Sequence, residues 1–288
     1  MMIGANNAAR SLYSEECQQL KERFLGCSEL LQKIRTCLRP RGELLDISLG
    51  AIILLITICA GYFCWAGFFT PVLQVVHSLS ISQAGYVATI YNVGYSFFAI
   101  IAGLLIHATA RFKWLAWIGL LIQLLGSGLM IYFQHPDKNL GYVCMCQIFI
   151  SFGGGTLYTC GDRAVMSVAK HADIATFLAL VVSSLCIGYG IGSSISGVIW
   201  VNTLPEQLAL WLPDYAQGNL TDIYGSLDVQ LSYPVGDPVR DAIVKAYGVT
   251  QQRMCIAGTV CFAVGFFAVG MWKDIKVKDI KQVKGTTF

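Results

Sequence analysis

Residues 175–200 read ATFLALVVSSLCIGYGIGSSISGVIW and contain no charged side chain. A helix that crosses a bilayer needs about 20 mainly apolar residues, because every backbone polar group must be bonded within the segment. This stretch therefore predicts a membrane-spanning helix. Gly188, Gly192 and Ser196 recur along it every four residues, so they form one small-residue stripe that another helix can approach closely. A neighbour within the chain is enough to explain the stripe.

Five other segments have the same apolar character. The whole sequence is 55% hydrophobic and 13% charged, whereas about a quarter of the residues in a soluble domain are charged. We therefore expect an all-α integral membrane protein with six spans, at 47–69, 84–108, 113–133, 140–160, 173–201 and 254–272. The chain then divides into a tail (1–44), five helices (45–201), a large loop (202–253), a sixth helix (254–272) and a second tail (273–288).

The distribution of positive charge orients these spans. If the chain crosses alternately, 16 of the 20 Lys and Arg residues lie on the side that holds both termini. Positive residues favour the cytoplasmic side, so we expect a multi-pass protein with both termini in the cytoplasm. The loop at 202–253 then faces the extracellular space or a lumen. Residues 14–38 have the amphipathic pattern of a helix at the membrane surface, and the lysines of 273–284 are placed to contact anionic lipid.

The sequence lacks the signatures of enzymes and of metal or nucleic-acid binding. It has no phosphate-binding glycine loop, zinc-ligand spacing or nucleophile motif. The 11 cysteines avoid the large loop, and those inside spans are expected to act as small hydrophobic residues. We therefore expect no catalytic activity, no resident metal or cofactor and no nucleic-acid partner.

Polar residues within the spans are few. Asn92 lies in the second span and Gln147 in the fourth, and Asp162 closes the fourth at its cytoplasmic end. A carboxylate at the bilayer centre costs about 3 kcal/mol, so we place Asp162 near the interface. It is either a solvated cap paired with Arg163 or a proton-coupling group. The run of glycines at 153–155 marks either a weak point or a close contact of the fourth helix.

The large loop has the pattern of a folded lid. Residues 237–250 predict a short amphipathic helix opened by Asp237 and Pro238. Asn219 begins an Asn-Leu-Thr acceptor for N-glycosylation, on the face predicted to be extracellular or lumenal. Loops of this length in a compact domain are usually functional. We therefore expect a lid against the outer mouth of the protein.

Four stretches of the sequence carry a family resemblance: LQVVHSLSISQAGYVATIYNVG (73–94), GYVCMCQIFISFGGGTL (141–157), SSISGVIWVNTLPEQLALWLP (193–213) and IYGSLDVQLSYPVGDPVRDAI (223–243). They resemble the carboxy-terminal half of fungal siderophore–iron transporters, a branch of the major facilitator superfamily, over about 48–280. The resemblance implies one six-helix half of such a transporter, with its large outer loop before the last helix. The implied cargo is a ferric siderophore of the hydroxamate type, imported with protons across the plasma membrane or an endosomal membrane.

The resemblance also implies candidate site residues. The first and fourth helices of such a half line the central cavity, which points to Tyr62, Trp65 and Gln147 as substrate contacts. Asn92 is a further candidate because it is polar at depth. The second and fifth helices face the other half, which suits the stripe described above. That assignment implies a missing partner half.

Two tyrosines of the large loop, Tyr224 and Tyr233, match the family's tyrosine-bearing motifs. They either contact the chelate, through ring and hydroxyl, or pack the lid onto the membrane domain.

A six-helix half cannot by itself rock two halves about a midplane site. A second half-transporter or a homodimer is therefore implied for transport. Two alternatives stay open: a drug–proton antiporter of the same superfamily, and an inactive half that acts as a partner or regulator of a full-length relative.

Overall fold

A computed structural model of the chain describes residues 42–136, 138–168 and 174–272, and the regular secondary structure in these ranges is entirely helical. The described residues from Ile47 onward belong to one compact unit, to which all contacts below belong. Within these described ranges, six helical segments are long and apolar enough to cross a membrane, which confirms the six-span, all-α expectation. The amphipathic helix expected at 14–38 and the lysine-rich tail at 273–288 lie outside the described residues.

The first span consists of two helices in succession. Helix α2 covers Gly42–Ala66 and helix α3 covers Phe69–Val76. Helix α2 thus begins within the segment expected to be a tail. The turn between α2 and α3 contains Gly67, and the sequence analysis did not predict this break.

Three helices of the second to fourth spans pack side by side: α4 (Ile81–Thr109), α5 (Lys113–Phe133) and α6 (Leu140–Val168). Ser80 caps α4 through its side chain, and Gln83 returns the bond to the Ser80 backbone, which fixes where this helix starts. Helix α6 runs without interruption through the glycines at 153–155. These glycines are therefore a close-contact site rather than a weak point.

The last two spans are longer than the sequence predicted. Helix α7 covers Ile174–Trp211 and helix α10 covers Pro238–Gly270. The expected segment boundaries at 201/202 and 253/254 thus lie inside continuous helices. The separate short helix expected at 237–250 is wrong, because α10 continues from it directly into the span. Its predicted start is confirmed: Asp237 is the N-cap and Pro238 opens the helix.

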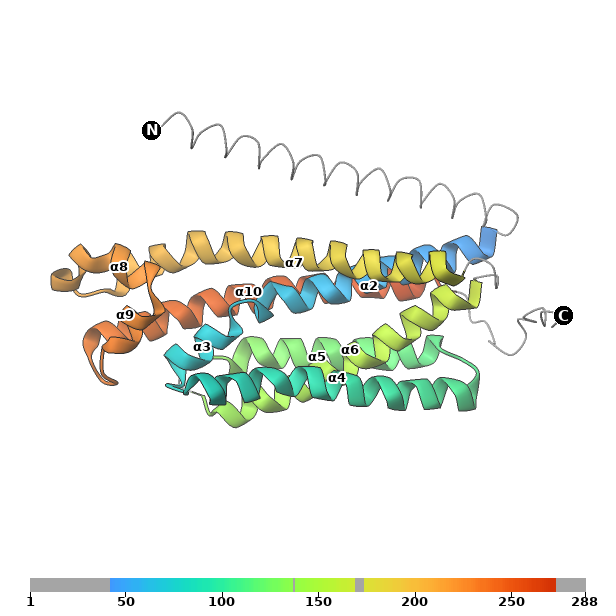
Figure 1. Cartoon of the computed structure of the whole chain (residues 1–288), viewed down its shortest axis with the longest axis horizontal. Coiled ribbons are helices and arrows are strands. Elements are labelled where there is room, and N and C mark those ends of the chain that lie inside the picture. The colour runs from blue at the N-terminus through green and yellow to red at the C-terminus, as the bar shows by residue number, and fades with distance from the viewer. Residues whose placement is uncertain (1–41, 137, 169–173, 273–288) are drawn as a thin grey trace, which may run out of the picture. The chain divides into compact units, whose positions relative to one another are not determined.

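Figure 1 shows α4, α5 and α6 as one group and α2, α7 and α10 as another. Glycines bring the helices of the second group together. A side chain at Gly61 of α2 would meet the Phe262 ring and, at 2.9 Å, the Gly258 carbonyl oxygen of α10. One close approach between the two groups is at Gly265 of α10, where an added side chain would lie 3.0 Å from Leu120 of α5.

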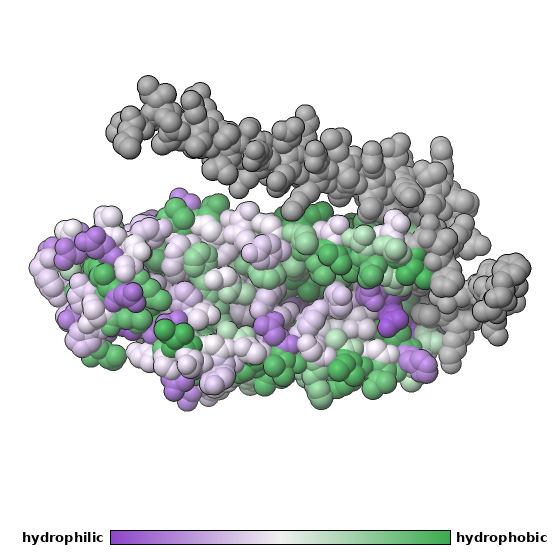
Figure 2. All heavy atoms as spheres, in the orientation of Figure 1, coloured by the Kyte–Doolittle hydropathy of each residue, from purple (hydrophilic) through white to green (hydrophobic). Residues whose placement is uncertain are grey.

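The residues at 202–253, which we call the cap, fold around their own apolar core. The cap comprises the ends of α7 and α10 and three short helices, η2 (Asp214–Asn219), α8 (Leu220–Gly225) and α9 (Leu227–Ser232). Buried side chains of the cap and of α3 form the core: Val72, Val75, Leu204, Leu208, Leu212, Ala216, Ile223, Val239, Ile243, Ala246 and Tyr247. Figure 2 shows hydrophilic residues over the end that carries α8 and α9. The loop is therefore folded, as expected, and it extends the α7 and α10 pair beyond α4–α6 (Figure 1).

Candidate substrate cavity

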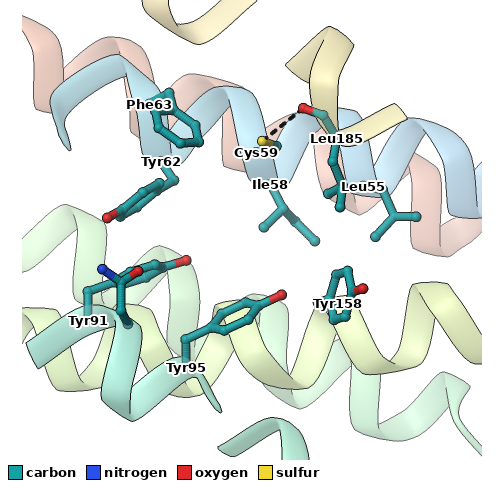
Figure 3. A pocket seen from close by; sticks show the side chains of 10 residues that line it. Leu55, Ile58, Cys59, Tyr62, Phe63, Tyr91, Tyr95, Tyr158 and Leu185 are labelled. Carbon is teal, nitrogen blue, oxygen red and sulfur yellow. Dashed lines mark hydrogen bonds between the residues drawn. The ribbon is translucent and has the colours of Figure 1, made fainter. Parts of the chain in front are cut away.

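A cavity of about 240 Å³ lies between the two helix groups. Helices α2, α4, α6 and α7 supply its walls (Figure 3). Its lining residues are Leu55, Ile58, Cys59, Tyr62, Phe63, Tyr91, Asn92, Tyr95, Tyr158 and Leu185. The lining contains no Lys, Arg, Asp or Glu, so the cavity suits a ligand without net charge that offers apolar surface and hydrogen-bonding groups.

Four tyrosines follow one another along this cavity. Tyr62 stacks on Tyr91, with ring centroids 4.0 Å apart. The Tyr91 and Tyr95 centroids are 5.9 Å apart, and those of Tyr95 and Tyr158 are 5.8 Å apart. Figure 3 shows Tyr62 on one wall and the other three on the opposite wall. Each ring offers an apolar face and a hydroxyl that can donate or accept a hydrogen bond. We call this set the tyrosine cavity.

Glycines of α6 hold the tyrosine-bearing wall in place. A side chain at Gly155 would collide with the Tyr95 carbonyl, and one at Gly154 would lie 2.9 Å from the Tyr91 hydroxyl. Helix α4 can therefore lie directly against α6. The sequence analysis missed Tyr91, Tyr95 and Tyr158, although a Tyr-x-x-x-Tyr spacing places Tyr91 and Tyr95 on one helix face.

One acidic residue lies beside the cavity. Asp162 follows Tyr158 by one turn of α6 and is half-buried. It interacts electrostatically with Arg163 and with the hydroxyls of Tyr158 and Tyr95. Both interpretations of Asp162, as a cap and as a proton-coupling group, stay predictions, since it neighbours a cation as well as the tyrosine cavity.

Some of the residues predicted to contact substrate line the cavity in the structure, and others do not. Tyr62 and Asn92 line the cavity, and their substrate role stays a prediction. Trp65 and Gln147 do not line it: both are buried, and Trp65 packs edge-on against Phe69 with centroids 5.3 Å apart. Neither amide atom of Gln147 has a hydrogen-bond partner. We expected these two residues at the cavity, but the structure places them in the core.

The small-residue stripe of α7 packs within the chain. Gly188 lies against Cys59 and the Ile56 carbonyl of α2, Gly192 against Ala60 of the same helix, and the Ser196 hydroxyl is 3.8 Å from the Met254 sulfur of α10. The expectation that this stripe faces a partner half is wrong, because its glycines provide the close approach of α2 to α7.

The predicted residues of the cap lie away from the tyrosine cavity. Tyr224 and Tyr233 are half-buried and pack against the cap core. Tyr233 also lines a shallow hollow of about 390 Å³, together with Asn219, Thr221, Asp222, Gly225, Ser226 and Val229. Asn219 and Thr221 are exposed, so the acceptor site is accessible. Glycosylation of Asn219 stays a prediction.

The described part of the chain shows no metal-binding group. It contains no cluster of three or more His, Cys, Asp or Glu residues that could hold an ion. The eight cysteines in this part are free thiols. One of them, Cys59, donates a hydrogen bond of 3.1 Å to the Leu185 carbonyl across the cavity wall (Figure 3).

Comparisons with known proteins agree with this architecture. A sequence profile described as "Major Facilitator Superfamily" matches residues 51–210. The chain is 46% identical over 260 residues to "MFS siderochrome iron transporter 1" of Ajellomyces capsulatus, a match that covers 89% of this chain and 44% of that protein. It is 43% identical over 237 residues to "MFS siderochrome iron transporter B" of Aspergillus fumigatus, covering 82% of this chain and 39% of that protein. The chain thus spans less than half the length of these relatives.

A solved structure has the same fold. It is the crystal structure of a bacterial homolog of the human lysosomal transporter Spinster, with a TM-score of 0.61 at 17% identity. The match covers 83% of this chain and 50% of that one. This confirms the expected likeness to one half of a transporter of this type.

Proposed function

Because this chain belongs to the Major Facilitator Superfamily, we propose that it forms one six-helix half of a carrier for ferric siderophores. The observation that carries the proposal is the uncharged, tyrosine-lined cavity between the two helix groups. In a ferric hydroxamate the chelating groups balance the charge of the metal, and the complex presents apolar edges with oxygen acceptors. Tyrosine rings and hydroxyls match both features. The siderochrome transporters named above support this cargo.

A second six-helix body completes the carrier. The cavity of about 240 Å³ is smaller than the roughly 300–1,000 Å³ of small-molecule sites. Few residues are buried in the apolar stretches of two helices that border the cavity: 17% in α4 and 28% in α7, against 56% in the first span. Their unburied faces suit either a separate half or a second copy of this chain.

Proton coupling is the second part of the proposal. Asp162 is a carboxylate beside Tyr158 and Tyr95, so its protonation can be sensed at the cavity. We place both termini in the cytoplasm, and the cap on the extracellular or lumenal side of the plasma membrane or an endosomal membrane. The charge distribution of the sequence supports this orientation.

The alternative is an inactive half that binds and regulates a full-length carrier. One half alone cannot rock two halves about a midplane site, so these residues would need a partner in either case. A drug–proton antiporter is less favoured, because the matches to siderochrome transporters cover 89% and 82% of this chain.

Uptake measurements test these functions. Iron-starved yeast that lacks its own siderophore carriers would express the chain alone, or the chain joined to the amino-terminal half of a relative, and receive radiolabelled ferric hydroxamate. We expect uptake that a protonophore abolishes once two halves are present. No uptake by a joined chain that reaches the membrane would contradict the carrier function. Changed uptake when the lone chain is expressed beside a full-length carrier would support the regulator instead.

A further inference from the structure

A buried glutamine lies behind the tyrosine-bearing wall of the cavity. Gln123 is in the middle of α5, its side chain is fully buried, and it does not line the cavity. Neither its Oε1 nor its Nε2 has a hydrogen-bond partner in the described structure. Buried polar groups almost always bond to the protein or to ordered water, and an unbonded amide inside a membrane helix is costly. We therefore expect a partner for this amide close by.

Two consecutive glycines of α6 bring Gln123 beside a cavity tyrosine. A side-chain carbon at Gly153 would lie 2.5 Å from Oε1 of Gln123 and 2.7 Å from the Gly119 carbonyl oxygen, so α6 lies directly against α5 there. A carbon at Gly154 would lie 2.9 Å from the Tyr91 hydroxyl oxygen and 3.6 Å from Oε1 of Gln123. Gly154 thus lies between a polar side chain of α5 and a polar side chain of α4.

The surroundings of Gly154 differ from those of the glycines beside it. A side chain at Gly153 or Gly155 would collide with backbone atoms of α5 or α4. The three atoms nearest to a carbon at Gly154 instead all belong to side chains, those of Tyr91, Tyr95 and Gln123. The space over Gly154 is therefore bordered by a hydroxyl and an amide.

The hydroxyl and the amide suit one bridging water molecule. Oε1 of Gln123 has no bonded partner, so it does not bond the Tyr91 hydroxyl directly. Both oxygens nevertheless lie around one point, on the scale of the two hydrogen bonds that a bridging water makes. A buried water needs two to four polar partners, and this hydroxyl and amide supply them. A larger residue than glycine at 154 would occupy the space between them.

Tyr91 connects this space to the cavity. It belongs to the cavity lining (Figure 3) and is 6% exposed. Its ring is fixed on one side by the stack on Tyr62, while its hydroxyl lies against Gly154. The hydroxyl proton can still rotate about the C–O bond. The hydrogen bonds behind the wall therefore decide whether Tyr91 offers the cavity a donor or an acceptor.

A water at this position would make Tyr91 a donor. The water has two protons, so it can donate one to Oε1 of Gln123 and the other to the Tyr91 oxygen. A direct bond to Oε1 would instead consume the Tyr91 proton. With the water in place, that proton stays free to bond a ligand. A ferric hydroxamate presents oxygen acceptors, which need such donors.

We propose that Gln123, Gly154 and Tyr91 form a buried water site, and that Gln123 is a positioning residue that directs the Tyr91 proton into the cavity through this water. The water site is a property of the fold. The positioning role rests on the proposed carrier function, because it concerns the recognition of the ligand.

Thermal unfolding of the chain in detergent tests the water site. Gln123→Leu removes one partner of the water, so we expect the midpoint to fall by about 2 °C or more. Gln147→Leu is the matched control, because Gln147 is equally buried with both amide atoms unpartnered and lies about two turns before Gly154 on α6. It should raise the midpoint. A rise with both variants would overturn the water site.

A methyl group at position 154 gives a second test. Gly154→Ala places a carbon between the Tyr91 hydroxyl and the Gln123 amide and leaves both groups in the chain. If the site holds a water, Gly154→Ala and Gln123→Leu displace the same molecule. The midpoint of the double variant should then be no lower than that of the more affected single variant. Fully additive shifts would overturn the water site.

Uptake kinetics of the joined chain test the positioning role. Tyr91→Phe should raise the KM for ferric hydroxamate about fivefold, which corresponds to about 1 kcal/mol, the net contribution of one hydrogen bond. Gln123→Leu should raise the KM by a similar factor although it does not line the cavity, and the double variant should raise it no further. Gln147→Leu should leave the KM unchanged. Factors that multiply to about 25-fold in the double variant would show two independent effects and overturn the positioning role.

The two parts of the proposal and the carrier function can fail separately. A lowered midpoint of Gln123→Leu with an unchanged KM would overturn the positioning role and leave the water site. Absence of uptake in every variant, including the unsubstituted joined chain, would overturn the carrier function, and thermal unfolding would then decide the water site. If Gln123→Leu does not fold, Gln123→Met, which keeps the length of the side chain without the amide, takes its place in both measurements.

Discussion

Tyr62 of α2 stacks on Tyr91 of α4, with ring centroids 4.0 Å apart and planes at 17°. This stack is the point at which the two helix groups meet across the cavity. Its rings come from opposite walls, so the relative positions of α2 and α4 determine the width of the site.

The first prediction concerns this tyrosine pair. In the joined, transport-competent chain, Tyr62→Ala should raise the KM for ferric hydroxamate about tenfold, because an aromatic contact contributes about 0.5–1.5 kcal/mol beyond burial. Tyr62→Phe, which keeps the ring, should have a smaller effect. Initial uptake rates at several concentrations, corrected for membrane abundance, measure this. Tyr86→Ala, at an exposed position of α4, is the control, and an equal effect there would contradict a role of the stack.

A second prediction concerns the contact of α4 with α6. Gly155→Val would drive side-chain atoms into the Tyr95 carbonyl and to within 3.0 Å of the Ala99 amide nitrogen. We expect a loss of several kcal/mol of stability and little folded protein, measured as the midpoint of thermal unfolding in detergent. Gly128→Ala, on α5, meets nothing within 4 Å and should be neutral or slightly stabilising. A Gly155→Val protein that melts like the parent would contradict the close contact.

The sequence predicted the spans well and the site only in part. The length of the apolar segments alone predicts six helices. In lipid, a spanning segment must form its backbone hydrogen bonds internally, and a helix does so. The sequence pattern of α7 and α10 changes where these helices leave the apolar region. The helices nevertheless continue, because the side chains of the cap core cover them. The stripe with Gly188 and Gly192 predicts close packing, but its partner depends on which helices become neighbours. Likewise, Trp65 and Tyr62 lie on one helix, and only the tertiary arrangement directs one to the core and the other to the cavity.

A third prediction separates packing from substrate contact at Gln147. Its side chain is fully buried and both amide atoms lack a partner in the described structure. An unsatisfied buried polar group costs about 1–3 kcal/mol, so Gln147→Leu should raise the stability of the protein and leave uptake unchanged. Thermal unfolding and uptake kinetics on the same preparation measure both. A tenfold loss of uptake with intact stability would restore Gln147 as a substrate contact.

The fourth prediction tests the orientation of the cap. If 202–253 faces the lumen or the cell exterior, the exposed Asn219 should carry an N-linked glycan when the chain is made in a eukaryotic cell. Asn219→Gln should then increase the electrophoretic mobility, and glycosidase treatment of the parent should reproduce the shift. Asn202→Gln, at another exposed asparagine without an acceptor sequence, should change nothing. A parent that is insensitive to glycosidase would count against this orientation.

The fifth prediction concerns the carboxylate beside the cavity. Asp162→Asn removes the charge next to Tyr158 and Tyr95 while keeping the size of the side chain. In the joined chain we expect ferric hydroxamate to bind but no longer to accumulate against its gradient, so a protonophore should have little further effect. Counterflow exchange, which needs no net proton movement, should continue. Asp228→Asn, at an exposed site on α9, should behave like the parent. Uptake by Asp162→Asn that still collapses with the protonophore would show that the coupling group lies elsewhere.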